Sequence, residues 1–322
     1  MMKHTVLVTG ASGFVGGALL ERLQADGKKT PIAVVRSDKQ LSAAVDIVRI
    51  EEISSQTQWK PHLANVDTII HCASRVHVMN DTEADPLEAF RRINVHGTLN
   101  LARQAAEAGV RRFIFISSIK VNGEGTFLDK PYTAEDAPAP TDPYGMSKSE
   151  AEQGLLQLAT TSAMDVVIIR PVLVYGPGVK ANFLNMMRWL DKGIPLPFGA
   201  INNRRSLVSI YNLVDLIVTC IDHPAATNQT FLVSDGDDLS TTELLCRMAR
   251  SLGKPVRLLP VPAWMLEFGA RVLGKKALSQ RLCGCLQVNI DKTQALLNWT
   301  PPVSVDEALA RTARHHRMNQ AK

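Results

Sequence analysis

The sequence predicts an α/β fold in which a doubly wound parallel sheet is followed by a smaller C-terminal α/β cap. Over the first 170 residues, short β-branched runs alternate with longer helical patterns, as in repeated βαβ units. A glycine-rich turn follows the first of these runs, and prolines divide the second half into short pieces. Of the 322 residues, 45% are hydrophobic, which is ample for a packed core and excludes a disordered chain.

The strands expected in the first part are mostly apolar, as in a sheet covered by helices on both faces. They are residues 6–9, 31–35, 47–50, 67–71, 112–117 and 166–170. Helices are expected over 14–25 and 86–108, because the apolar residues recur at helical spacing and Gly109 is a typical helix stop.

After residue 170, one further strand (229–233) and a helix (241–252) indicate that the chain returns to the sheet before it completes the cap. We therefore assign two interleaved domains and a tail. The sheet domain takes 1–175 and about 206–235, the cap about 176–205 and 236–315, and the tail 316–322.

Composition excludes several classes of protein. The net charge of +5 arises from 36 basic and 31 acidic residues spread along the chain, so a nucleic-acid surface is not expected. The five cysteines form no Cys-x-x-Cys pair or zinc-site pattern, which predicts reduced thiols and no metal. Without a leader-like start or an 18-residue apolar run, we expect a cytoplasmic protein without stable membrane insertion.

The turn after the first strand, Thr-Gly-Ala-Ser-Gly-Phe-Val-Gly, is typical of a Rossmann-type dinucleotide site. Gly10 permits the tight turn, Gly13 lets the backbone approach a pyrophosphate, and Gly16 allows close packing of helix on strand. The N–H groups at the helix start, from Phe14 and Val15, face the anion. These five residues are expected to bind the cofactor.

The end of the second strand indicates which nicotinamide cofactor binds. An NAD site usually has an acid here for the ribose hydroxyls, but this chain has Arg36 and Ser37, followed by Asp38 and Lys39. Arg36 and Ser37 can hydrogen-bond a 2′-phosphate. NADP(H) is therefore favoured, and Asp38 leaves NAD(H) open.

A Tyr-x-x-x-Lys pair, Tyr144 and Lys148, precedes a helical segment and lies on one helix face. Ser118 follows a strand, at the edge where such sheets place reacting groups. Tyrosine needs a lowered pKa to exchange a proton near neutrality, and a neighbouring ammonium favours its phenolate. We expect Ser118 to hold a substrate oxygen against Tyr144 while hydride passes at the same carbon.

Together with these residues, the stretches 71–74 (HCAS), 94–98 (NVHGT) and 170–177 (RPVLVYGP) resemble the extended short-chain dehydrogenase/reductases of the NAD-dependent epimerase/dehydratase type. The resemblance covers nearly the whole chain. It implies that His71 is a wall histidine and that Asn94 supports Lys148. It also implies that the cofactor is lined by Ala73, Ser74, Asn94, Ser117, Tyr144, Lys148, Pro171 and Val172.

The cap resembles that of nucleotide-sugar enzymes. The resemblance places Asn182 and Arg205 at the diphosphate of a UDP-sugar, with Arg281 as a second clamp in a stretch that departs from the usual pattern. An arginine fork suits phosphate oxygens.

The residues after Ser118 narrow the reaction. Sugar-nucleotide 4,6-dehydratases carry Asp-Glu there, whereas this chain has Ile119 and Lys120, which disfavours a dehydratase. The stretches 116–124, 74–79 and 286–288 resemble bacterial O-antigen enzymes that reduce C4 of UDP-4-keto-6-deoxy-N-acetylhexosamines. The leading hypothesis is therefore an NAD(P)H-dependent 4-keto-reductase for surface polysaccharide sugars, in which Tyr144 is the acid.

Three alternatives stay open. The first is an NAD-dependent UDP-sugar 4-epimerase, which uses the same serine, tyrosine and lysine. The second is a reductase of small carbonyl compounds, disfavoured by Arg205, and the third is a non-enzymatic nicotinamide sensor, disfavoured by the complete trio. The apolar segment 264–273 is compatible with a cap core, a dimer surface or a membrane face, and we expect the core. The resemblance also implies that a homodimer can form.

Overall fold

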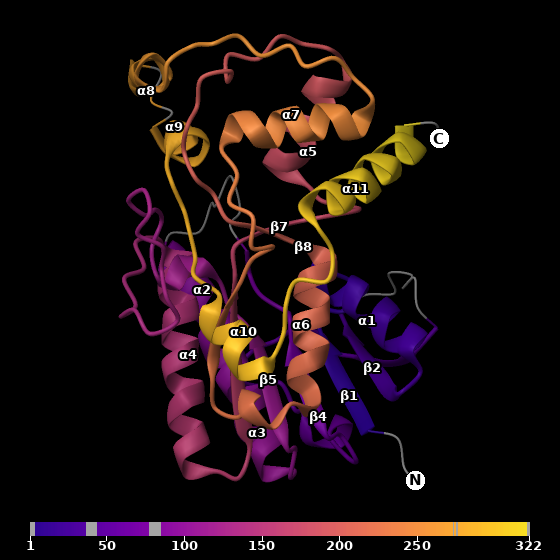
Figure 1. Cartoon of the computed structure of the whole chain (residues 1–322). Coiled ribbons are helices and arrows are strands. Elements are labelled where there is room, and N and C mark those ends of the chain that lie inside the picture. Colours follow the sequence, from indigo (N-terminus) through magenta and orange to yellow (C-terminus); the bar gives the residue numbers. More distant parts are fainter. Residues whose placement is uncertain (1–3, 37–43, 77–84, 273, 275, 321–322) are drawn as a thin grey trace.

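The computed structural model describes residues 4–36, 44–76, 85–272, 274 and 276–320. Within them, a seven-stranded parallel sheet has the order β3-β2-β1-β4-β5-β6-β9 (Figure 1). The order reverses between β1 and β4, so ligands are expected in the crevice at the carboxyl ends of these strands. The strands are β1 (His4–Thr9), β2 (Lys29–Val35), β3 (Asp46–Arg49), β4 (Thr68–His71), β5 (Arg112–Ile116), β6 (Asp165–Pro171) and β9 (Thr230–Val233).

Every expected strand is present, with ends that differ by at most two residues. The helix expected over 14–25 is α1 (Phe14–Asp26), and the helix over 241–252 is α7 (Thr241–Leu252). The single helix expected over 86–108 is wrong in one respect, because a π-helical segment interrupts it. The three consecutive pieces are α2 (Pro86–Arg91), η2 (Arg92–Gly97) and α3 (Thr98–Glu107).

Helices cover both faces of the sheet. Alternate residues of a strand point to opposite faces, and Val6 and Val8 of β1 pack in one cluster with the leucines of α1 and of α6 (Ile210–Asp222). Leu7 packs in the other cluster, with α3 and α4 (Pro143–Thr161). The two apolar layers hold the carboxyl ends of the strands at one edge.

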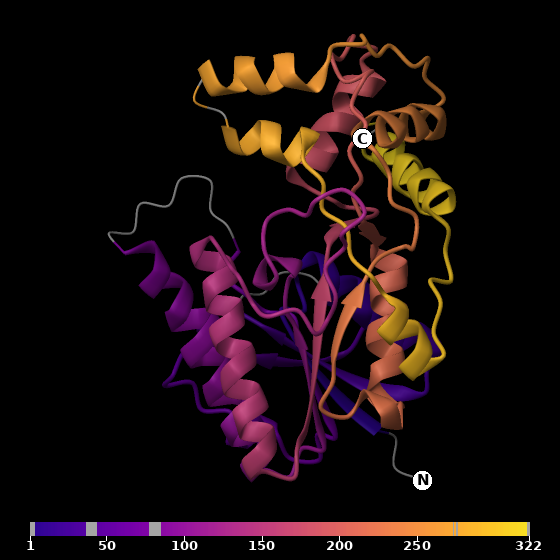
Figure 2. The same cartoon turned by 60° about the vertical axis from the view of Figure 1, so that its left-hand side comes forward.

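The cap lies beyond that edge (Figures 1 and 2). A short parallel pair, β7 (Leu173–Tyr175) and β8 (Leu207–Ser209), leads into it. Its apolar core includes Phe183 and Met187, together with Leu245, Met248 and Leu309. Its helices are α5 (Ala181–Asp191), α7, α8 (Ala263–Val272), α9 (Lys276–Cys283) and α11 (Val305–Gln320).

Two segments depart from the expected boundaries. Helix α10 (Asp291–Leu297) falls in the range assigned to the cap but packs against β9 and η4 (Pro224–Ala226) of the sheet domain. The Thr293 hydroxyl donates to the Leu232 carbonyl across 2.7 Å. Helix α11 continues through Gln320, past the expected start of the tail at 316, because His316 is buried.

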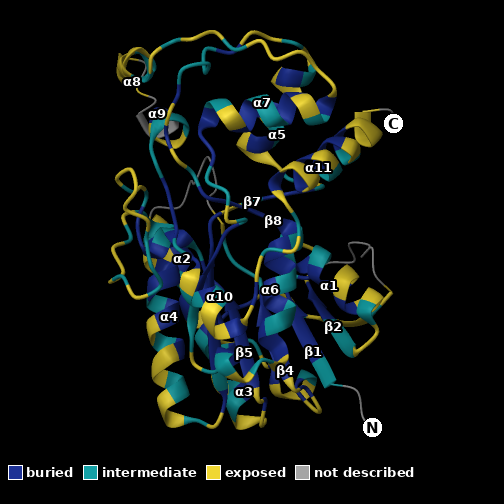
Figure 3. Cartoon of the chain, in the orientation of Figure 1, coloured by how far each residue is buried: buried dark blue, intermediate teal, exposed yellow. Residues whose placement is uncertain are grey.

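The expectation that the apolar segment 264–273 belongs to the core of the cap is wrong, because its described residues lie in the exposed helix α8. None of its residues is buried (Figure 3). Trp264 and Phe268 are 68% and 65% exposed. The helix packs chiefly on α9, so its apolar residues face outward. No described helix is long and apolar enough to cross a membrane.

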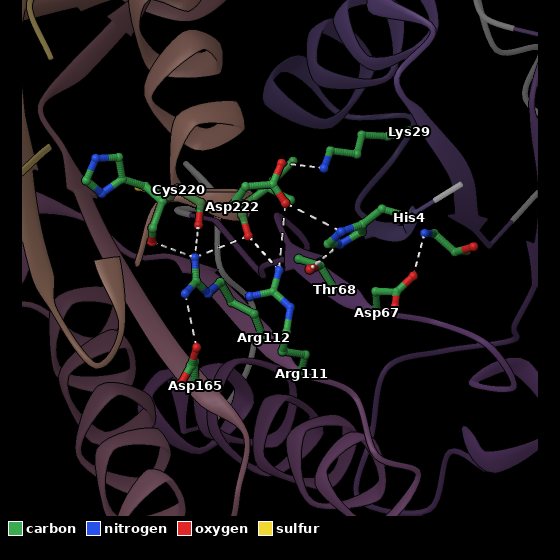
Figure 4. Close-up of polar contacts among 12 residues, drawn as sticks. His4, Lys29, Asp67, Thr68, Arg111, Arg112, Asp165, Cys220 and Asp222 are labelled. Atoms are coloured by element: carbon green, nitrogen blue, oxygen red, sulfur yellow. Dashed lines mark hydrogen bonds and ion pairs between the residues drawn. The ribbon is translucent and has the colours of Figure 1, made fainter. Parts of the chain in front are cut away.

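At the amino ends of the strands, Arg112 joins the sheet to the end of α6 (Figure 4). Its side chain is 2% exposed and donates to the carbonyls of Cys220, Ile221 and His223 at 2.7, 3.1 and 2.9 Å. It also pairs with Asp165 at 3.0 Å. A cation here satisfies the last carbonyls of the helix and complements its dipole.

We predict that Arg112→Met lowers the free energy of unfolding by about 3 kcal/mol, because it leaves buried carbonyls without donors. Arg111→Met is the matched control. Arg111 is exposed, and at the same helix end it donates to the Ile221 carbonyl at 2.9 Å and forms a long ion pair with Asp222 at 3.8 Å, so its loss should cost less than about 1 kcal/mol. Urea unfolding measures both, and equal costs would contradict this role for Arg112.

Candidate active site at the carboxyl edge of the sheet

The turn between β1 and α1 is tightly packed against the segment after β4. Gly10 has φ +70°, and a Cβ on it would lie 2.7 Å from the Ala73 nitrogen. A Cβ on Gly16 would lie 2.3 Å from the Gly10 carbonyl oxygen, so only glycine allows α1 to start directly on the turn. No side chain caps α1, and its first turn carries no acid. The N–H groups at Phe14 and Val15 therefore fit a dinucleotide diphosphate.

Most other residues expected at the cofactor lie along this edge. Arg36 follows β2 and is exposed, whereas Ser37 lies outside the described residues. Ala73 and Ser74 follow β4. Pro171 ends β6, and Val172 is 4% exposed beside it.

The first turn of α4 brings Tyr144 to the hydroxyls of Ser118 and Ser74. The Asp142 carboxylate caps the helix by accepting from the Gly145 N–H at 2.6 Å. Loss of hydration raises the pKa of Tyr144 to about 12. Hydrogen bonds to Ser74 and Ser118 oppose this rise, and the Asp142 charge adds to it. A positive charge beside this phenol would be needed to bring its pKa toward neutrality.

Lys148 lies one turn further along α4 and is 1% exposed. Burial lowers the pKa of its ammonium to about 7, and the charge of Glu152 opposes this shift. Its Nζ is 3.9 Å from the centre of the Phe115 ring. The structure thus places Lys148 between the ends of β4 and β5, where a change in its protonation state is accessible near neutrality.

Behind the lysine, Glu152 and Arg170 form a buried ion pair, with 2% and 5% exposure. Arg170 Nη2 lies 2.6 Å from one Glu152 oxygen, and Nε lies 3.0 and 3.1 Å from the two oxygens. The Ser117 hydroxyl also donates to Glu152, and Arg170 Nη1 donates to Asn122 Oδ1 at 3.0 Å. Ser117, expected at the cofactor, therefore directs its hydroxyl to Glu152.

Asn94, within the π-helical segment, joins the β4 loop to α4. Its Oδ1 accepts from the Arg75 N–H at 2.8 Å and from the Ser74 hydroxyl at 3.1 Å. Its Nδ2 donates to Ser147 Oγ at 3.0 Å. Asn94 thus positions the neighbours of Tyr144 and Lys148, and π-helical insertions of this kind are frequent at functional sites.

His71 is a buried structural residue, as the family resemblance implies. It is 1% exposed, with Nδ1 2.7 Å from Thr9 Oγ1 and Nε2 3.0 Å from Thr98 Oγ1. Burial and then the charge of Lys148 lower its pKa to about 3, so the ring is neutral and is not a base near pH 7.

The expected substrate residues lie in the cap. Arg205 Nη1 donates to the Gly284 carbonyl at 3.0 Å. Burial lowers the pKa of Arg205, and the positive charge of Arg281 also lowers it. Asn182 is exposed in the first turn of α5. The described residues contain no group of three His, Cys, Asp or Glu side chains placed to hold a metal.

Residues 6–234 match the family model described as the NAD dependent epimerase/dehydratase family. The chain belongs to this family. It is 51% identical over 313 residues to a UDP-glucose 4-epimerase of Vibrio cholerae, covering 97% of this chain and 95% of that one. It is 28% identical over 337 residues to an N-acetyl-α-D-glucosaminyl-diphospho-ditrans,octacis-undecaprenol 4-epimerase of Escherichia coli O157:H7, with coverage of 100% and 98%.

The fold of this family member matches solved structures along its whole length. A UDP-glucuronic acid 4-epimerase from Bacillus cereus in complex with NAD has a TM-score of 0.79 at 18% identity, with coverage of 98% of this chain and 99% of that chain. The Rossmann-type α/β fold, the enzyme class and the family expected from the sequence are confirmed.

Sequence reasoning missed the Glu152–Arg170 pair. Tyr144, Lys148 and Glu152 follow one another at intervals of four residues, so they share one face of α4. From this spacing, Glu152 could have been predicted to lie near the other two. The other partner is contributed by a different strand, β6, and no local pattern identifies it.

We predict that Glu152→Gln lowers the free energy of unfolding by about 3–5 kcal/mol, because it leaves the Arg170 charge buried and uncompensated. It should also lower the pKa of Lys148 further, since it removes the carboxylate that favours the ammonium. Chemical unfolding measures the first effect. The matched control is Glu150→Gln on the same helix, where a partly exposed pair with Arg91 at 2.7 Å should contribute less than about 1 kcal/mol. An equal loss in both variants would contradict the assignment.

We also predict that His71 makes stability depend on pH. Its folded pKa of about 3 lies below the ordinary 6.5, so between these values the unfolded chain binds a proton that the folded chain does not. Stability should therefore fall as pH drops from 6.5 toward 3, by about 2 kcal/mol at pH 5. Unfolding curves of the native protein and His71→Asn test this, and parallel pH dependences would show that His71 does not contribute.

Proposed function

We propose that this enzyme is an NAD-dependent 4-epimerase of a UDP-sugar. The observation that carries the proposal is the 51% identity, over almost the full length, to a UDP-glucose 4-epimerase. Ser118 and Tyr144 lie together at the carboxyl edge, as this chemistry requires. Ile119 and Lys120 stand where a dehydratase carries its acid and base. The comparisons thus favour the epimerase alternative over the reductase that we placed first.

In the proposed reaction, Tyr144 takes the proton from the C4 hydroxyl as hydride leaves the same carbon, and returns it after the keto sugar has turned. When bound, NAD would accept this hydride and return it to the opposite face of C4, and its positive nicotinamide ring would favour the phenolate. Ser118 donates to the C4 oxygen and orients it. Lys148 in its ammonium form adds positive charge to the edge, and the charge of Glu152 favours that form.

In the cap, we propose that Arg205, Arg281 and Asn182 hold the UDP diphosphate. Burial and the positive charge of Arg281 lower the pKa of Arg205, and a bound diphosphate would offset these positive charges. The sugar is proposed to be a hexose or an N-acetylhexosamine, since the two relatives are named for glucose and N-acetylglucosamine. A role in surface polysaccharide synthesis is also proposed, from the resemblance to O-antigen enzymes.

A UDP-4-keto sugar reductase is the second candidate, favoured by one observation. Arg36 stands exposed at the end of β2, where an acid would contact the ribose of NAD, and a reductase consumes diffusible NADPH. We propose NAD for the epimerase, and Arg36→Glu distinguishes the cofactors. If Arg36 holds a 2′-phosphate, this variant weakens NADPH binding by at least about tenfold and leaves NADH binding unchanged or stronger.

The proposal is tested by incubating the protein with UDP-glucose, and separately with UDP-N-acetylglucosamine, without added cofactor. Proton NMR of the anomeric signals should show the C4 epimer of at least one sugar. If instead neither sugar reacts, and NADPH is consumed stoichiometrically with a UDP-4-keto-6-deoxy-N-acetylhexosamine, the enzyme is the reductase.

We predict that Tyr144→Phe lowers kcat by about 10²–10⁴-fold with little change in UDP-sugar affinity, because it removes the proton carrier and keeps the ring. Tyr132→Phe is the control. The Tyr132 hydroxyl donates to the Gly125 carbonyl at 2.7 Å, away from α4, so the variant should retain most activity. Full turnover by Tyr144→Phe would contradict the assigned role.

A further inference from the structure

Next to the active site, the side chain of Lys120 lies between two carboxylates. It belongs to the short helix η3 (Ile119–Val121), which follows Ser118. Its Nζ pairs with Glu124 Oε1 at 3.0 Å and also with Asp142 Oδ2. All three side chains are one-quarter to one-third exposed. A partly exposed ion pair contributes little to stability. Its charges can still change the pKa of neighbouring groups.

The Asp142 carboxylate is shared between two partners. Its Oδ1 accepts from the Gly145 N–H at 2.6 Å and caps α4, while its Oδ2 faces Lys120. The first turn of α4 also packs directly against the backbone of η3, because a Cβ on Gly145 would lie 2.8 Å from the Lys120 carbonyl oxygen. A further bond, from the Ala139 N–H to the Val121 carbonyl at 2.9 Å, ties the two segments. Lys120 and the start of α4 thus form one unit.

Tyr144 stands two residues after Asp142, in that same first turn. The negative charge of Asp142 is among the causes that raise the pKa of Tyr144. An ammonium bound to this carboxylate cancels much of its field at the phenol. The other groups near Tyr144 are Lys148 on α4, the hydroxyls of Ser74 and Ser118, and Phe90 of α2, which carries the Arg75 guanidinium over its ring. The nearby Glu150 of α4 is already paired with Arg91 of α2.

We infer that Lys120 is a positioning residue for proton transfer. Its ammonium neutralises the Asp142 carboxylate that caps α4, so this carboxylate does not disfavour the Tyr144 phenolate. Lys120 acts through Asp142, and it touches neither Tyr144 nor the substrate in this role. The inference rests on the proposed part of Tyr144 in catalysis. It adds a residue that the serine, tyrosine and lysine trio does not include.

The inference requires a specific pattern among four variants. Lys120→Met leaves Asp142 uncompensated and should move the Tyr144 titration up by about 0.5–1 pH unit. Lys120→Arg retains the charge and should restore the native titration. Asp142→Asn removes the charge but still caps the helix, because asparagine is an equally good N-cap. It should move the titration down, because the Lys120 charge is then unopposed. Lys120→Met combined with Asp142→Asn removes the two charges together and should titrate like the native protein.

The experiment measures the tyrosinate absorbance of each protein in its complex with NAD between pH 6 and 11. The same series on a Tyr144→Phe background is subtracted, so only Tyr144 contributes. Where epimerase turnover is detected, the alkaline shift should be matched in the pH profile of kcat, with KM for the UDP-sugar unchanged. Melting temperatures verify folding, and Lys120→Gln replaces Lys120→Met if the latter does not fold.

An unchanged titration in Lys120→Met, or a full upward shift that persists in the double variant, would overturn the inference. The titration needs no sugar, so an absence of UDP-sugar turnover would count against the proposed epimerase and not against Lys120.

Discussion

The buried ion pair between Glu152 and Arg170 is the interaction on which the geometry of the site depends. It links the middle of α4 to the end of β6, and through Ser117 and Asn122 it also links both to the end of β5 and to η3. Two charges taken out of water yield little net stability, but either one alone would be costly. The pair therefore selects one arrangement of α4 against the sheet, and Tyr144 and Lys148 are held by that arrangement.

The amino and carboxyl edges of the sheet differ in what their charged residues do. At the amino edge, Arg112 satisfies the last carbonyls of α6 and contributes to stability. At the carboxyl edge, a tight glycine turn, buried ionisable groups and a π-helical segment come together from distant parts of the chain. Lys148 is buried with a pKa of about 7, and burial raises the pKa of Tyr144. These groups are costly for folding, and the apolar layers on both faces of the sheet, together with the Glu152–Arg170 pair, keep them in place.

Much of this architecture is predictable from the sequence, because strands buried on both faces read as apolar runs and the glycine turn has a distinctive spacing. Ser118, Tyr144 and Lys148 are predicted for the same reason, since their chemistry is tied to strand ends and to one helix face. The π-helical segment around Asn94 was not foreseen, because one inserted residue hardly alters an apolar period. Nor were Arg170 and Asp142, whose partners lie 18 and 22 residues away. The exposure of α8 depends on what packs against it, and its sequence does not encode that.

The central claim is that hydride leaves C4 of a UDP-sugar and returns to the same carbon, so the overall reaction is redox-neutral. The most direct test is to supply UDP-glucose and UDP-N-acetylglucosamine deuterated at C4, without added nicotinamide, and to follow the label by NMR. The account predicts that the C4 epimer of at least one sugar forms and keeps its deuterium. Loss of deuterium from C4 to solvent or to a diffusible cofactor during conversion would contradict it.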